Sequence, residues 1–208
     1  MEEVLGWVRR RRLTLSLIVL FAGWYGLQLS VLTFFGEGVA RWWFYFDKPP
    51  NMVSPGIMFG PISHNMSTLT HIGGNVFFLF VAGGFAEPYI GEKKILYVVF
   101  GLGYLGTYLA NVTALLHQLW MIAGASGGIL ALWAYSGLKL RHKAYEYQSG
   151  LAFSRDGVEQ ITAVLLILGI PAFLLHEAVL AAQFHSGYII GLVLGCVYFG
   201  YEEYFKAR

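Results

Sequence analysis

Long apolar stretches, separated by short charged or turn-forming segments, dominate the chain. The first runs from 13 to 36 without a charged residue, which is long enough for a helix that crosses about 30 Å of hydrocarbon. We expect spanning helices at residues 13–35, 68–86, 94–115, 126–138, 158–176 and 182–201. The fourth is short for a full crossing, so its first residue, Ser126, is expected below the membrane surface and inside the protein.

The composition agrees with a membrane protein of several spans. Of the 208 residues, 57% are hydrophobic and only 12% are charged, whereas soluble domains carry about 25% charged residues. The net charge of +2 gives no basis for a nucleic-acid partner. We therefore expect an all-α, polytopic membrane protein in which residues 1–208 form one six-helix transmembrane domain in the lipid bilayer.

The basic residues orient the expected bundle, because cytoplasmic loops carry an excess of Lys and Arg. With the N-terminus inside, twelve of the fourteen Lys and Arg residues fall on the inner side, and only Arg41 and Lys48 fall outside. We expect a multi-pass protein of a prokaryotic cell membrane, with residues 1–12 and the C-terminus in the cytoplasm. The outer segment 37–64 holds an aromatic run at 42–46 and four prolines, and is expected in the membrane interface.

One serine lies at the start of an apolar run with glycines beside it, in the sequence Gly124-Ala125-Ser126-Gly127. A hydroxyl in lipid usually bonds to its own helix backbone. The neighbouring glycines remove bulk, as if another molecule had to reach Ser126. Alone this motif is weak, and it indicates chemistry only if other segments supply a base and donors for an oxyanion.

Two other expected spans carry polar side chains at the outer depth of Ser126. His71 and Asn75 are four residues apart and share one face of a helix. For that pair alone, a helix–helix hydrogen bond is the simpler interpretation. His185 stands near the outer end of the last span, ahead of glycines at four-residue spacing, which suit close helix packing. These glycines are Gly187, Gly191 and Gly195.

Together these residues form the set that acyl transfer to water requires. Ser126 would be the nucleophile and His185 the general base. His71, Asn75 and backbone N–H groups would donate hydrogen bonds to the oxyanion. Glu177 lies in a short outer loop with no clear geometry to orient His185, so a two-residue dyad is more economical than a triad.

The ordered set of motifs resembles the rhomboid family of intramembrane serine proteases. The motifs are His71-x-x-x-Asn75, Gly83-Gly84-x-x-Glu87-x-x-x-Gly91, Gly124-Ala125-Ser126-Gly127, and a histidine with a glycine stripe on the last span. The resemblance covers roughly residues 13–201. No single motif is decisive, but their order along the chain is quite specific.

The resemblance implies a six-transmembrane-helix rhomboid-like bundle that hydrolyses peptide bonds in or near the transmembrane segments of its protein substrates. No metal or cofactor would be needed. The catalytic dyad would be Ser126 and His185. His71 and Asn75 would stabilise the oxyanion, and Gly124 would let the scissile carbonyl approach.

Other residues are implied to be structural. Glu87 would hold the turn between the second and third spans. The glycines expected to serve packing are Gly127, Gly187, Gly191 and Gly195.

The chain departs from the family pattern near both histidines. The family usually has a second histidine five residues before the position of His71, where this chain has Met66, and His64 lies nearby. The family's base usually precedes its first stripe glycine by three residues, whereas His185 precedes Gly187 by two.

Two other functions stay open on sequence alone. One is a catalytically inactive rhomboid-like protein that binds transmembrane helices, as a chaperone or quality-control factor, and the offset of His185 favours it. The other is a small transporter or channel. That class is weaker, because transporters usually show internal repeats and charge pairs at the membrane midplane, and neither is visible here.

Overall fold

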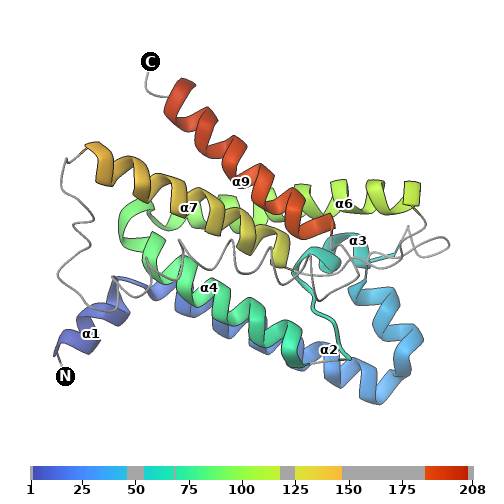
Figure 1. Cartoon of the computed structure of the whole chain (residues 1–208). Helices are drawn as coiled ribbons and strands as arrows, with labels where there is room; N and C mark the ends of the chain where they lie inside the picture. The colour runs from blue at the N-terminus through green and yellow to red at the C-terminus, as the bar shows by residue number, and fades with distance from the viewer. Residues whose placement is uncertain (1, 46–53, 68, 118–124, 147–185, 206–208) are drawn as a thin grey trace.

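The computed structural model consists of helices and contains no strand in the residues that it describes, which are 2–45, 54–67, 69–117, 125–146 and 186–205 (Figure 1). Its elements are α1 (Glu2–Arg9), α2 (Arg12–Phe44), α3 (Gly56–Phe59), η2 (Gly60–Ile62), α4 (Leu69–Ile90), α5 (Glu92–Leu96), η3 (Tyr97–Leu102), α6 (Gly103–His117), α7 (Ser126–Glu146) and α9 (Ser186–Phe205). The helical content agrees with the expected all-α class.

Two stretches of helix are long and apolar enough to cross a bilayer, Arg12–Phe44 and Glu92–Val112. A third apolar stretch, Leu69–Gly84, is shorter. Helices α7 and α9 cover the fourth and sixth expected spans, while the expected span at 158–176 lies outside the described residues. The number of six spans therefore stays a prediction.

Helix α7 forms the centre of the described structure. It packs against α4, α6, η3 and α9, and it runs in the same direction as α4 and α9, whereas α2 and α6 run in the opposite direction (Figure 1). Every side chain from Ile129 to Tyr135 is at most 4% exposed. A helix that is apolar on all faces suits this central place, because each face meets another helix.

The helices extend beyond the apolar segments from which they were expected. α7 continues past 138 to Glu146, and α2 reaches Phe44. In α2, a kink at Gly36, with φ 83° and ψ 171°, separates the expected span from the outer segment. That backbone conformation is essentially restricted to glycine.

The outer segment packs back onto the bundle through aromatic rings. Trp24 of α2 meets Phe44 and Phe59, with ring centroids 5.5 Å and 5.3 Å apart. From α6, the hydroxyls of Tyr104 and Tyr108 donate hydrogen bonds of 2.6 Å and 2.7 Å to backbone carbonyls of α3. These contacts fasten the segment between α2 and α6.

At the inner end of α4, a proline creates the docking point for a buried arginine. Pro88 lacks an N–H, so the carbonyl of Gly84 loses its usual donor within the helix. The Arg11 Nε–H takes that place and donates a 2.6 Å hydrogen bond to the Gly84 oxygen. The Arg11 side chain is only 1% exposed, and its guanidinium lies 4.5 Å from the ring centroid of Trp7.

The neighbouring Glu87 caps the start of α2. Its two carboxylate oxygens accept hydrogen bonds of 2.8 Å from the backbone N–H groups of Leu13 and Thr14. A carboxylate at a helix N-terminus satisfies donors that have no partner within the helix and complements the helix dipole. The Glu87 carboxylate therefore holds the start of the first expected span. At the turn between the second and third expected spans, the Glu87 backbone oxygen accepts a 3.1 Å hydrogen bond from the Gly91 N–H.

Candidate active site

Ser126 begins α7 and is 8% exposed. In this first turn the Ile129 N–H donates a hydrogen bond of 3.0 Å to the Ala125 oxygen. The N–H groups of a helix's first turn have no acceptor within the helix, and the dipole is positive at that end. The position of Ser126 therefore suits stabilisation of negative charge.

Gly128 of α7 and Gly191 of α9 allow neighbouring helices to approach the start of α7 closely. A Cβ on Gly128 would lie 1.9 Å from the Val99 oxygen of η3, and a Cβ on Gly191 of α9 would lie 2.2 Å from the Gly127 oxygen. Only glycine permits these backbone contacts, which press η3 and α9 onto the start of α7. Gly128 and Gly191 thus serve helix packing, and the access to Ser126 that the sequence indicated stays a prediction. Gly124 lies outside the described residues.

His71 and Ser126 lie at the same level on two parallel helices. Phe78 of α4 stacks obliquely on Trp133 of α7, with ring centroids 4.6 Å apart. Both His71 and Ser126 lie seven residues, or two turns, before these rings. Seven residues return a helix to nearly the same face, so His71 is on the side of α4 that meets α7, and Ser126 is on the side of α7 that meets α4.

Asn75 follows His71 by one turn and is 5% exposed. Its side-chain Nδ2 is buried without a hydrogen-bond acceptor among the described residues. Buried polar atoms are normally hydrogen-bonded to protein or water. The amide is thus a buried donor available to a small polar group at this depth.

His64 contributes a second imidazole beside His71. The two ring centroids are 5.9 Å apart with a T-shaped arrangement, and His64 is completely buried. Neither ring nitrogen of His64 has a hydrogen-bond partner in the described structure. Burial, with a smaller contribution from His71, lowers the pKa of His64 to about 3, so this imidazole is neutral at physiological pH.

The backbone of His64 is held in place from the first helix. The Gln28 side chain accepts a hydrogen bond from the His64 N–H at 3.0 Å and donates one to the His64 oxygen at 3.1 Å. The Tyr45 hydroxyl accepts a hydrogen bond from the Met66 N–H at 3.0 Å. Sequence reasoning missed Gln28 and Tyr45, because their partners lie 36 and 21 residues away and no local pattern connects them.

The structure fixes how α9 sits on α7, while His185 lies outside the described residues and immediately precedes α9. Gly191 lies on Gly127, and Gly195 lies on Ala131, where a Cβ would be 2.3 Å from the alanine oxygen. Two of the stripe glycines therefore bring α9 into backbone contact with the helix that begins at Ser126.

No group of three His, Cys, Asp or Glu residues in the described part of the chain could hold a metal ion. The sequence model of the Rhomboid domain matches residues 61–201, which is more than half of the chain. None of the curated proteins matches the chain. The matched region includes His64, His71, Asn75 and Ser126.

Proposed function

The chain belongs to the rhomboid family, and on that premise we propose that it is a serine endopeptidase that hydrolyses peptide bonds in or near transmembrane segments of membrane proteins. Members of this family are usually intramembrane serine proteases, although inactive members exist. The observation that carries the proposal is the 4.6 Å contact between the rings of Phe78 and Trp133. It supports a common level for His71 and Ser126, because each lies two turns before one of these rings.

In the proposed reaction, His185 accepts the proton of the Ser126 hydroxyl as its oxygen attacks the substrate carbonyl carbon. His71, Asn75 and the backbone N–H of Ser126 stabilise the resulting oxyanion. His185 then gives its proton to the leaving amine, and a water molecule, activated by the same base, hydrolyses the acyl-enzyme. Gly124 would leave space for the scissile carbonyl.

The proposed topology is a six-span bundle with both termini in the cytoplasm. Helices α7 and α9 run in the same direction (Figure 1), which supports a return crossing between them. The expected span at 158–176 would make that return. The polar site would then face the outer half of the membrane, where substrate helices end.

The proposal is tested with purified protein in lipid vesicles and two labelled single-span substrates. One carries helix-breaking glycine and small residues near the outer end of its span, and the other has leucine at those positions. Because a helical backbone buries its amides, we expect cleavage of the first and little of the second. If the protein binds both substrates but cleaves neither, the proposed protease function is contradicted and the second candidate below is favoured.

The second candidate is an inactive rhomboid protein that binds transmembrane helices. One observation favours it: Gly191 lies on Gly127, the residue that follows Ser126. His185 is six residues before Gly191. On a helix that continued upstream, six residues amount to about 9 Å and about 600° of rotation, which would turn His185 away from Ser126. Catalysis therefore requires the chain to leave the helical path at His185.

We further propose that His64 positions His71 in the oxyanion site. Replacing His64 by leucine should lower kcat by about tenfold, which corresponds to about 1.4 kcal/mol of transition-state stabilisation. The unfolding midpoint should stay equal or rise, because the exchange removes two buried nitrogens without partners. The control is Met66→Leu, which should leave kcat unchanged. If His64→Leu raises the midpoint and keeps full kcat, His64 only fills the core.

A further inference from the structure

Helices α7 and α9 keep one register over more than three turns. Gly191 lies on Gly127 and Gly195 lies on Ala131. Towards the inner end, the rings of Tyr135 and Phe199 are 6.4 Å apart, and Lys139 forms an ion pair with Glu203. Each of these four pairs is 64 residues apart, so the two helices pack in parallel without slippage.

The glycine stripe alone does not select this register. Gly191 and Gly195 both lack a side chain and are one turn apart, so a shift of α9 by one turn would still place a glycine on α7. Such shifts, of about 5.4 Å, are known where one helix ratchets along another. Some other contact must distinguish the observed register.

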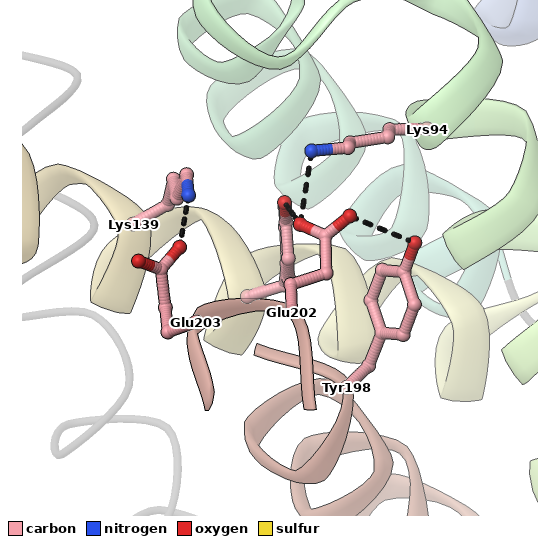
Figure 2. Close-up of polar contacts among 6 residues, drawn as sticks. Lys94, Lys139, Tyr198, Glu202 and Glu203 are labelled. Atoms are coloured by element: carbon pink, nitrogen blue, oxygen red, sulfur yellow. Dashed lines mark hydrogen bonds and ion pairs between the residues drawn. The ribbon is translucent and has the colours of Figure 1, made fainter. Parts of the chain in front are cut away.

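A buried carboxylate at the inner end of α9 provides that contact. Glu202 is 5% exposed and accepts hydrogen bonds from Lys94 Nζ of α5 at 2.9 Å, from Tyr135 Oη of α7 at 2.5 Å, and from Tyr198 Oη of its own helix at 3.3 Å. Figure 2 shows Lys94 and Tyr198 converging on Glu202, with the Lys139–Glu203 pair beside them. We call Lys94, Tyr135, Tyr198 and Glu202 the Glu202 cluster.

Burial alone would raise the pKa of the Glu202 carboxyl, but hydrogen bonds from Tyr135 and Lys94 and the charge of Lys94 lower it below its usual value. The Glu202 carboxylate is therefore charged, and its charge is stabilised by the hydrogen bonds and the ion pair with these partners. A shift of α9 by one turn would separate it from Tyr135 and Lys94 and leave the charge unpaired, which is strongly unfavourable. Fixing a register is the best-attested use of buried polar groups.

We propose that Glu202 is a positioning residue that sets the register of α9 on α7 and thereby the approach of the base to Ser126. This inference rests on the proposed protease function. Ser126 begins α7, and His185 immediately precedes α9, so a shift at the inner end is carried along both helices to the site. A misplacement of about 1 Å by a distant mutation can cost about 100-fold in rate.

The test compares wild type with Glu202→Leu and with the exchanged pair Lys94→Glu/Glu202→Lys. Glu92→Leu is the matched control, because Glu92 pairs with Arg12 at the surface, where both side chains are largely exposed. We expect Glu202→Leu to lower kcat and the rate at which a fluorophosphonate labels Ser126 by at least tenfold, with KM unchanged. The exchanged pair should recover part of both rates, and Glu92→Leu should match wild type.

A second readout follows the register itself, independently of activity. Spin labels are placed at Val19 of α2 and Val193 of α9, which are 72% and 53% exposed, in a background in which Cys196 is replaced by serine. Pulsed electron–electron resonance should give one narrow distance in the otherwise wild-type protein and a shifted or broadened one in Glu202→Leu.

An unchanged distance distribution in Glu202→Leu would overturn the inference. The inference would also be overturned if Glu202→Leu lowered the unfolding midpoint but left the labelling rate of Ser126 per folded molecule unchanged. That result would show that Glu202 has a purely structural role. If the wild type neither cleaves nor labels, the proposed protease function fails, and the distance distribution alone then decides whether Glu202 sets the register.

Discussion

Replacing Ser126 by alanine is expected to abolish substrate cleavage while the protein stays folded. The exchange removes the nucleophilic oxygen, and in serine proteases loss of the nucleophile lowers kcat by roughly 10⁶-fold. Ser126 lies at the first residue of α7 and is 8% exposed, and the exchange removes a single oxygen atom, so the unfolding midpoint should change little. The measurement is product formation from the glycine-containing single-span substrate in vesicles.

The matched control is Ser136→Ala. Ser136 lies on the same helix, is 1% exposed, and its hydroxyl has no hydrogen-bond partner in the described residues. This variant should cleave at the wild-type rate. Cleavage by Ser126→Ala at the rate of Ser136→Ala would show that Ser126 is not the nucleophile.

Replacing Gly191 by alanine is expected to destabilise the bundle and to lower activity. The new Cβ would lie 2.2 Å from the Gly127 oxygen. The backbones of α7 and α9 would therefore have to move apart. Overpacking of this kind costs about 1–3 kcal/mol. Because the contact is one residue from Ser126, cleavage should fall as well. Thermal unfolding in detergent and the cleavage assay measure the two effects.

Gly200 of the same helix supplies the control, since nothing lies within 4 Å of a Cβ built there. Gly200→Ala should be neutral or stabilising by up to about 1 kcal/mol, because alanine favours a helix more than glycine does. Equal unfolding midpoints for Gly191→Ala and Gly200→Ala would contradict the close contact of α7 and α9.

Long apolar stretches and the low share of charged residues were enough to predict a helical membrane protein, and the ordered motifs were enough to predict its family. The kink of α2 at Gly36 lies where the expected first span ends, although the helix itself continues to Phe44. The helix ends were predicted less well. Hydropathy indicates where lipid contacts the chain, whereas Lys139 and the charged residues after it are good helix formers and extend α7 to Glu146.

The polar anchors could not be predicted from local spacing. Glu202 and Lys94 are 108 residues apart, and Arg11 and Gly84 are 73 apart. Only the packing of the helices brings these groups together. A weak signal was present, since Tyr198 and Glu202 are four residues apart at the end of an apolar helix and share its face.

In the site, residue types and spacing predicted roles for His71, Asn75 and Ser126, and these roles stay predictions. The sequence could not predict the close packing at Gly128, because that depends on the Val99 oxygen in another helix. The arrangement of His185 relative to Ser126 remains a prediction, since His185 lies outside the described residues.

The central claim is that Ser126 is activated, and covalent labelling tests it most directly. Purified protein is treated with a fluorophosphonate, and mass spectrometry identifies the modified residue. We predict an adduct on Ser126 in the wild type, formed at least about 100-fold faster than in His185→Ala, in line with the usual contribution of a general base. No adduct on Ser126, or equal rates in the two proteins, would contradict the account.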